Sequence, residues 1–447
     1  MVYFLTAVAA IAGFLFGYDE GVIAVALPLI EKDFPMTPFV SGFMTAAVPL
    51  GALFAACFAG RVTDRFGRRR VLMVAAAVFA AAALIAAAMT AIWILVVARF
   101  VLGFAIGLAA VVAPLYISES APRAIRGALV ATYQLAITFG ILVSYLAGLA
   151  FGSGGSWRMM FALGAVPAGL FLVGLAFLPE SPRWLVLRGF SDAAKASIRR
   201  LRGAGADVDR ELGEIRSSLA ASTGKKAGYA ALLAPLVRPA LIVAMGLYFL
   251  QQLSGINAVI YYAPEIFGKA GFDSGSTQRL ATVGVGSVNF LATMLGMYLI
   301  DRLGRRPLLV LGFCGTAFAM LLIAVAVANP NLVPSWVVVA ALLLYIASFA
   351  ISLGPLPHVM MSEVFPLHMR GAGMSMASIS NWGFNFLVVL TFPLLLAGPG
   401  LAFTFTIFAV VCLCGVAFTL LRVPETANHS LEAIESHLMS GRPLAKL

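Results

Sequence analysis

Residues 248–267 read YFLQQLSGINAVIYYAPEIF, a stretch of membrane length with a dense polar cluster inside it. A side-chain amide buried in hydrocarbon without a partner costs on the order of 2–7 kcal/mol, so this cluster is not expected to face lipid. At about 100° per residue, an unbroken helix would place Gln252 and Asn257 roughly 140° apart. We therefore expect the helix to loosen near Gly255, because local breaks are tolerated where backbone lines a cavity. The polar residues are Gln251, Gln252, Ser254 and Asn257.

A simpler interpretation of this stretch is that its amides only bond neighbouring helices. That interpretation gives no reason for so many polar groups at one depth. A polar cavity does.

The composition of the 447 residues, 62% hydrophobic and only 11% charged, is that of a polytopic membrane protein and excludes a soluble one. The net charge of +11 does not indicate a nucleic-acid partner, because the basic residues follow the membrane topology derived below. Four cysteines lie in apolar runs, where small core residues are a better interpretation than a metal site or a disulfide. They are Cys57, Cys314, Cys412 and Cys414.

Twelve apolar stretches are long enough for the ~20 helical residues that cross a bilayer. They lie near 3–27, 39–60, 71–90, 93–118, 127–150, 157–178, 239–266, 277–300, 308–328, 336–362, 371–397 and 400–422. The sequence thus predicts an all-α polytopic membrane protein of two pseudo-symmetric halves. These are an N-terminal six-helix bundle at 1–178 and a C-terminal one at 239–423, with a cytosolic helical linker at 179–238 and a tail at 424–447.

Lysine and arginine set the expected orientation, because cytosolic loops are enriched in them. With the first span starting inside, 25 of the 30 basic residues are cytosolic and Arg99 lies within a span. The four on the outer side are Lys32, Arg158, Lys269 and Arg279. Both termini are therefore expected in the cytosol of a cell-membrane protein. Residues 1–27 lack a basic leader and a small-residue cleavage site, so we expect a retained span.

Internal repetition supports two related halves. The motif DRFGRR at 64–69 recurs as DRLGRR at 301–306, an offset of 237. Glu119 is followed seven residues later by Arg126-Gly127, and Glu363 by Arg370-Gly371, an offset of 244. Each copy falls at the predicted cytosolic face after the same-numbered helix of its half, which favours duplication.

The two motif copies are not identical at their start. The first begins with Gly60, whereas the second has Met297 at that spacing and Gly296 one residue earlier. We expect the second copy to be looser, with its charged core retained.

The linker is too charged to span a membrane. Its pattern predicts two amphipathic helices, one capped by Ser191 and ended by Gly203, the other around 208–219. We expect a solvated surface there and no chemistry.

These motifs, in this order, resemble the sugar porter family of the major facilitator superfamily over nearly the whole chain. The signatures are GYDEGVI at 17–23, GRVTDRFGRRR at 60–70, RFVLGFAIG at 99–107, PESPRW at 179–184, QQLSGINAVIYYAPEIF at 251–267, DRLGRR at 301–306 and PET at 424–426. The resemblance implies two bundles that rock about a central site, open alternately to each side.

The resemblance also implies a set of sugar-binding residues. They are Gln134, Gln251, Gln252, Asn257, Asn289, Asn381 and Trp382, with Phe16 and Tyr261 nearby. The chemistry supports this set independently, because amides both donate to and accept from sugar hydroxyls while an indole face covers the apolar C–H surface of the ring. The spans carry no basic cluster, which argues against a phosphorylated or anionic substrate.

His358 marks a departure from the family, many of whose members carry tryptophan at this position. A histidine inside the membrane is a functional candidate by default, although a bond to a neighbouring helix explains it equally well. Ile141, where some xylose carriers have glutamine, also leaves the substrate open. We include His358 among the candidate substrate-binding residues.

Asp19 and Arg99 are expected at the same depth, about 9–12 Å below the outer boundary at 1.5 Å per residue. A lone charge there costs at least ~2.5–3.5 kcal/mol, so we expect them to pair. In the family, an acid at the Asp19 position resembles proton-coupled symporters, whereas facilitators that need no proton commonly carry a neutral residue. The resemblance therefore implies proton symport, with structural pairing as the alternative. Glu20 is unusual for the family, whose members usually have a small polar residue there; its role is unassigned, and a second proton acceptor is one interpretation.

Charges at the cytosolic face alternate in sign across the two halves. They resemble the family's ion-pair latch, which holds the outward-open state; topology signals are a second role for the arginines. The residues are Asp64, Arg65, Arg68, Glu119, Arg126, Glu180, Arg183, Asp301, Arg302, Arg305, Glu363 and Arg370.

The leading hypothesis is a proton-coupled importer of a neutral monosaccharide such as glucose, galactose or xylose, acting as a monomer in the bilayer without cofactor or metal. An inositol or other polyol carrier and an uncoupled facilitator are alternatives. A non-transporting sensor fits less well, because only about two dozen residues follow the last span. An enzyme fits least, since neither a metal-ligand cluster nor a nucleophile triad is present and Gly284-x-Gly286 lies in an apolar span.

Overall fold

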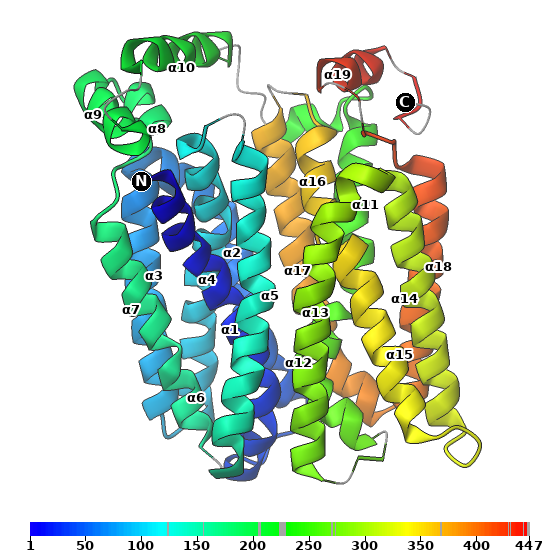
Figure 1. Ribbon diagram of the computed structural model, residues 1–447. Coiled ribbons are helices and arrows are strands. Elements are labelled where there is room, and N and C mark those ends of the chain that lie inside the picture. The colour runs from blue at the N-terminus through cyan, green and yellow to red at the C-terminus, as the bar shows by residue number, and fades with distance from the viewer. Residues whose placement is uncertain are drawn as a thin grey trace. The chain divides into compact units, whose positions relative to one another are not determined.

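The computed structural model describes residues 1–122, 125–154, 156–203, 207–222, 229–269, 271–272, 274–366, 369–427, 429, 431–440 and 442–444. All of its regular elements are helices (Figure 1). In the described part of the chain, twelve helical segments are long and apolar enough to cross a membrane, so the twelve predicted spans are confirmed.

The first six spans precede the linker. They are α1 (Val2–Asp33), α2 (Pro38–Phe66), α3 (Arg68–Ala88), α4 (Ile92–Ser120), α5 (Arg126–Phe151), and α6 (Trp157–Leu163) continued by α7 (Ala165–Ala176), with a short turn η2 (Gly152–Gly154) after α5. The apolar side chains of α7 show why lipid is needed. Val166, Leu170, Val173 and Phe177 follow one another at i, i+4, i+7 and i+11, and each is more than half exposed. A stripe of this kind is stable only against hydrocarbon.

The last six spans follow the linker. They are α11 (Arg238–Leu253) with α12 (Ile256–Lys269), α13 (Gly275–Leu303), α14 (Arg305–Ala328), α15 (Ser335–Ser348) with the π-helical turn η4 (Phe349–Leu353) and α16 (Leu356–Glu363), α17 (Arg370–Ala397), and α18 (Leu401–Arg422). A short helix, α19 (Leu431–Met439), comes after them.

The predicted break near Gly255 is confirmed. Gly255 has a φ of +88°, a left-handed conformation that suits glycine and separates α11 from α12. The ring of Phe408 fills the space that a Cβ would need. A second interruption, the π-helical turn η4 between α15 and α16, was not predicted from the sequence.

The linker contains α8 (Pro182–Leu187), α9 (Ser191–Arg202), α10 (Val208–Ser222) and the turn η3 (Tyr229–Leu233). The two predicted helices are present as α9 and α10, and α9 ends at Gly203, whose φ is +93°. The predicted cap was wrong: Ser191 is the first helical residue, and its hydroxyl accepts a hydrogen bond from Arg216 at 2.8 Å.

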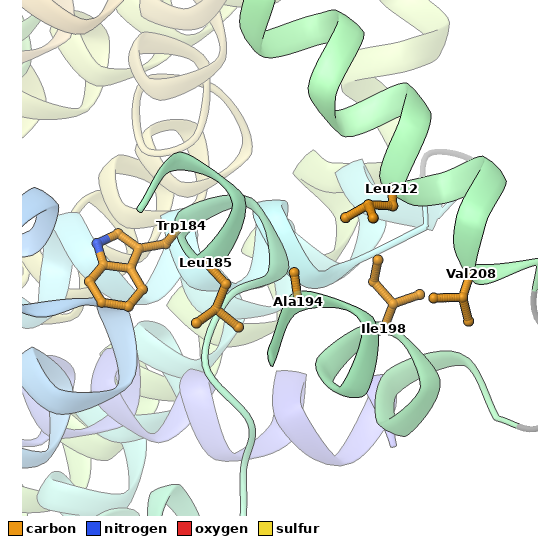
Figure 2. Packing of buried hydrophobic residues seen from close by; sticks show 6 residues of the cluster. All are labelled: Trp184, Leu185, Ala194, Ile198, Val208 and Leu212. Atoms are coloured by element: carbon orange, nitrogen blue, oxygen red, sulfur yellow. The ribbon is translucent and has the colours of Figure 1, made fainter. Parts of the chain in front are cut away.

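An apolar cluster holds the linker helices together (Figure 2). Its members are Trp184, Leu185, Ala194, Ile198, Val208 and Leu212. The indole of Trp184 also donates to the carbonyl oxygen of Asp64 at 3.0 Å, which ties α8 to the end of α2. The charged linker therefore has a small core of its own, anchored to a membrane span.

The chain divides into two compact units. Unit 1 is Met1–Asp19, Ala47–Ile141 and Arg158–Lys226; unit 2 is Glu20–Ala46, Leu142–Trp157 and Ala227–Leu447. Three spans, α1, α2 and α5, therefore contribute one part to each unit. The domain boundaries predicted from the order of the chain stay a prediction.

Candidate functional site

The break at Gly255 brings the amides of α11 and α12 together in unit 2. Asn257 Nδ2 donates to Gln252 Oε1 at 2.7 Å, and Gln252 Nε2 donates to Asn381 Oδ1 on α17 at 2.5 Å. The side chains of Gln252 and Asn257 are about 5% exposed. These three amides form a chain of hydrogen bonds at membrane depth, which is the convergence that an unbroken helix would prevent.

The π-helical turn η4 supplies partners for the next amide. Gln251 Nε2 donates to the carbonyl oxygen of Leu353 at 2.6 Å and to that of Gly354 at 3.3 Å. Tyr345 donates to the Ser254 carbonyl oxygen at 2.9 Å, which ties the broken backbone to α15. Each interruption frees backbone carbonyl oxygens from helical hydrogen bonds, and polar side chains then donate hydrogen bonds to them.

The other predicted sugar-binding residues lie on several helices. Asn289 on α13 and Trp382 on α17 are buried in unit 2, at 5% and 4% exposure. Gln134 on α5 and Phe16 on α1 are half-buried residues of unit 1. Tyr261 on α12 is buried, and its hydroxyl donates to Glu20 Oε1 at 3.4 Å.

His358 is exposed although it belongs to a membrane span. Its ring packs edge to face against Tyr248, with centroids 5.2 Å apart. Its Nδ1 lies 3.4 Å from the carbonyl oxygen of Gly354, one of the two carbonyls that Gln251 also contacts. An exposed imidazole beside the amide chain has a ring nitrogen available to a ligand.

Asp19 and Arg99 form the expected pair inside unit 1. Arg99 Nη1 lies 3.3 Å from Asp19 Oδ1, and the two side chains are 0% and 2% exposed. Asp19 Oδ2 has no hydrogen-bond partner among the described residues. The guanidinium also lies 5.8 Å from the centroid of Phe161. One carboxylate oxygen is therefore held by a cation, while the other is open to a proton.

Glycines set the close helix packing around this pair. A Cβ on Gly17 would collide with the backbone of Ile137, and one on Gly140 would collide with the backbone of Phe14. These contacts bring α1 against α5 next to Asp19. Glycine is needed because the two backbones touch.

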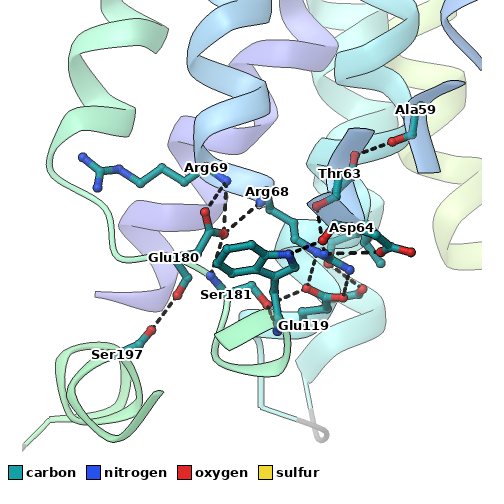
Figure 3. A network of polar contacts seen from close by, with 12 residues as sticks. Ala59, Thr63, Asp64, Arg68, Arg69, Glu119, Glu180, Ser181 and Ser197 are labelled. Atoms are coloured by element: carbon teal, nitrogen blue, oxygen red, sulfur yellow. Dashed lines mark hydrogen bonds and ion pairs between the residues drawn. The ribbon is translucent and has the colours of Figure 1, made fainter. Parts of the chain in front are cut away.

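Arg68 is the centre of a polar network at the linker end of unit 1 (Figure 3). Its Nη2 donates to Glu119 Oε1 at 2.8 Å, and its Nε lies 2.8 Å from Oε2 of the same carboxylate, which gives a two-point ion pair. Glu180 accepts from the backbone amides of Arg68 and Arg69 at the first turn of α3. Ser181 Oγ donates to Glu119 Oε2 at 2.5 Å.

Unit 2 has a matching network around Arg305. Its Nη2 lies 3.3 Å from Glu363 Oε1. Glu425 accepts from the backbone amides of Arg305 and Arg306, both at 3.0 Å, at the first turn of α14. Thr426 Oγ1 donates to Glu363 Oε2 at 2.5 Å. Each unit thus contains an arginine, two acidic residues and a hydroxyl in the same arrangement.

Residues 5–438 match the family described as Sugar (and other) transporter. The chain belongs to this family. It is 40% identical over 453 residues to the galactose-proton symporter of Escherichia coli strain K12, which covers 100% of this chain and 96% of the relative. The arabinose-proton symporter of the same strain is 37% identical over 451 residues, or 99% of this chain and 95% of the relative.

Solved structures support the same assignment of this sugar-transporter family member. The xylose transporter XylE from E. coli, in a partially occluded inward open conformation, is 31% identical with a TM-score of 0.84, covering 95% of this chain and 98% of that chain. A structure of the proton:xylose symporter XylE bound to 6-bromo-6-deoxy-D-glucose is 32% identical with a TM-score of 0.80, covering 97% of this chain and 98% of that chain. The predicted major facilitator fold and its family are confirmed.

The remaining charged residues that family resemblance assigned to the latch are more open to solvent. Asp64 is 57% exposed and lies 3.6 Å from Arg68, while the guanidinium groups of Arg65 and Arg302 lie over the rings of Phe66 and Tyr298. Arg126 and Arg183 are half-buried. The side chains of Asp301 and Arg370 lie outside those that the structure describes.

The latch prediction missed two residues of this family member, Glu425 and Thr426. A signal for them was available, because Pro179-Glu180-Ser181 and Pro424-Glu425-Thr426 are 245 residues apart, close to the offset of 244 between Glu119 and Glu363. Among the described residues, no group of three or more His, Cys, Asp or Glu side chains could hold a metal ion.

Proposed function

We propose that this chain imports a neutral monosaccharide together with protons by alternating access. Relatives that cover nearly the whole chain carry the names of galactose-proton and arabinose-proton symporters. The observation that carries the proposal is the Asp19–Arg99 pair, a fully buried acid that keeps one oxygen open to a proton.

The sugar is bound by the amide chain of unit 2. Gln252, Asn257 and Asn381 satisfy one another in the described structure, and a sugar hydroxyl can replace one amide in each of these bonds, because hydroxyls both donate and accept. Trp382 offers an indole face to the apolar side of the ring. Asn289, Gln134, Phe16 and Tyr261 complete the proposed set, which contains no charged side chain and so favours a neutral ligand.

Proton coupling is the role of Asp19. Protonation removes its charge and releases Arg99 from the ion pair, which changes the relative free energies of the two access states. A proton gradient can then drive sugar uphill. In the proposed orientation both termini are cytosolic, and the networks around Arg68 and Arg305 form the inner latch. Joint loss of the two networks is expected to shift a balanced equilibrium between the access states.

The decisive test is uptake of labelled sugars and inositol by proteoliposomes, with and without an imposed pH gradient. Asp19→Asn should abolish accumulation driven by the gradient, while exchange of sugar across equilibrated membranes continues. Asp192→Asn, on the exposed start of α9, is the matched control and should accumulate sugar as the parent does. Undiminished uphill uptake by Asp19→Asn would contradict the coupling role.

The sugar site is tested separately by titration calorimetry on purified protein. Gln252→Ala and Asn257→Ala should each weaken sugar binding by about 1–3 kcal/mol, the cost of leaving a buried polar group unsatisfied. Asn329→Ala, an exposed amide at the end of α14, is the control. If both site variants bind as the parent does, the amide chain is not the sugar site.

His358 is proposed to set the choice among sugars. Replacing it with tryptophan puts a larger apolar ring face beside the amides, so His358→Trp should change the order of preference by at most ~1–3 kcal/mol between two competing sugars. Competition uptake assays measure this order. An unchanged order would identify His358 as a structural residue.

A further inference from the structure

Glu20 is a buried acid that the coupling mechanism above does not use. Its side chain is only 4% exposed, and it follows Asp19 directly on α1. The first segment of unit 1 ends at Asp19 and unit 2 begins at Glu20, so the two neighbouring acids belong to different units. A carboxylic acid at membrane depth needs a reason, because its ionised form is costly there.

A groove of about 310 Å³ in unit 2 is lined in part by Tyr261, which contacts Glu20. One wall comes from α1, where the lining residues Ala24, Leu27, Pro28 and Glu31 recur at helical spacing on one face. Glu20 lies one helical turn before Ala24 and so belongs to the same face. The opposite wall is α12, with Tyr261 and, toward the end of the helix, Glu265 and Lys269.

Tyr261 connects the groove to Glu20. Its ring lines the groove, and its hydroxyl donates to Glu20 Oε1 at 3.4 Å. Tyr261 also lies four residues after Asn257, on the helix that carries part of the proposed sugar site. Two phenols interact with Glu20 from other helices, Tyr145 on α5 and Tyr261 on α12. Asp19 precedes Glu20 on α1.

We propose that Glu20 is a second proton-binding residue, which takes its proton from water in the α1–α12 groove and transmits its charge state to the sugar site through Tyr261. The ionised carboxylate accepts a charge-assisted hydrogen bond from the phenol, which keeps its own proton. When a carboxylate oxygen gains a proton from a hydronium ion in the groove, leaving a water molecule, that bond weakens to a neutral one. The strength of the hydrogen bond that joins α1 to α12 beside the sugar site then changes with the pH of the groove.

This inference rests on the proposed function, and the Asp19→Asn background separates the two. In that background the Asp19 proton site is absent. If Asp19 is the sole titrating group, sugar exchange between equilibrated compartments will then not depend on pH. We expect exchange by Asp19→Asn to remain pH-dependent, changing severalfold across the titration, and to become flat in Asp19→Asn/Glu20→Gln. Glu214→Gln, in a solvent-accessible ion pair with Arg210 on α10, should leave the pH dependence of the Asp19→Asn background in place.

A second variant keeps the test decisive if Glu20→Gln fails to fold. Tyr261→Phe in the Asp19→Asn background keeps the acid but removes the hydrogen-bond donor to its ionised form. The midpoint of the pH profile should then move to higher pH, a shift that a purely structural tyrosine would not cause. Exchange by Asp19→Asn that is already flat, a profile that persists after Glu20→Gln, or an unmoved midpoint in Tyr261→Phe each overturns the proposal. Retained uphill uptake by Asp19→Asn overturns the proposed function instead.

Discussion

The Arg68 network of unit 1 and the Arg305 network of unit 2 contain the same kinds of residues, but the ion pair of unit 1 is less exposed to solvent. Arg68 and Glu119 are 4% and 7% exposed and meet at two points of 2.8 Å. Arg305 and Glu363 are 15% and 18% exposed and meet at 3.3 Å. A shorter pair with less solvent around it has the stronger Coulomb interaction, and it also leaves a more costly charge when one partner is lost.

The backbone contacts of the two networks do not differ in this way. Glu180 caps the first turn of α3, and Glu425 caps that of α14, each through two backbone amides. The turn before each helix is a glycine with positive φ, Gly67 at +91° and Gly304 at +86°. The comparison shows that the helix caps are alike in the two units, whereas the ion pairs differ in length and in exposure.

Removal of each arginine should give the largest difference between the units. Arg68→Ala leaves Glu119 nearly buried without its cation, and we expect it to lower the free energy of unfolding by about 3–5 kcal/mol. Arg305→Ala removes one partner of an ion pair that water already reaches, so the free energy of unfolding should fall by only about 1 kcal/mol. Thermal unfolding in detergent measures both. Equal losses would show that the difference in burial has no energetic consequence.

The turn glycines should give an intermediate effect that is the same in both units. Gly67→Ala and Gly304→Ala put a Cβ into a conformation that costs about 1–3 kcal/mol for other residues. The Cβ would also meet the capping carboxylate, Glu180 or Glu425. Gly203→Ala is a matched control, because its φ is +93° while its Cβ would meet no described atom within 4 Å.

The three Gly→Ala variants should therefore differ in how much stability they lose, as measured by thermal unfolding. Gly203→Ala reports the backbone strain alone, and the two turn variants should lose more stability than it does. If all three lose the same, the carboxylate caps move aside at no cost. If the two turn variants differ from each other, the caps are not equivalent.

The sequence predicted features that depend on a single segment, together with one ion pair between two segments. The twelve spans follow from apolar length, because a helix is the backbone form that satisfies itself in lipid. The break at Gly255 follows from the divergence of Gln252 and Asn257 on an ideal helix. The pairing of Asp19 with Arg99 follows from their equal depth and the cost of a lone charge.

Apart from the Asp19–Arg99 pair, the features that depend on which segments touch were not predicted. Hydropathy counts spans but does not report that α1 leaves unit 1 after Asp19, nor that Tyr261 contacts Glu20. The π-helical turn at Phe349–Leu353 depends on Gln251, about a hundred residues away, as a donor to its carbonyls. Ser191 was predicted as a cap from local sequence, whereas Arg216 binds its hydroxyl.

Neutralising the capping acids should give a smaller effect, equal in the two units. Glu180→Gln and Glu425→Gln keep a hydrogen-bond acceptor near the backbone amides but remove the charge at a helix N-terminus. We expect a loss of about 0.5–2 kcal/mol in each, the usual value of an N-terminal cap. Thermal unfolding of the two variants side by side is the measurement. A loss confined to Glu180→Gln would mean that unit 2 no longer depends on its cap.

The smallest expected effect belongs to the first residue of the motif. A Cβ on Gly60 would meet no described atom within 4 Å, so Gly60→Ala should raise the free energy of unfolding by about 0.5–1 kcal/mol, the preference of an α-helix for alanine over glycine. Gly296, the nearest glycine of the second copy, is different, because its Cβ would lie 2.6 Å from the Ile351 carbonyl oxygen. Gly296→Ala should therefore destabilise where Gly60→Ala stabilises.

If Gly60→Ala unfolds at a higher temperature yet transports sugar more slowly, the space beside Gly60 must close in another state of the cycle. The glycine would then serve the movement of unit 1, and the looser start of the second copy would mean that unit 2 lacks that contact. If both stability and transport rise or stay unchanged, Gly60 has no steric role, and the asymmetry of the two motif copies lies in their ion pairs alone.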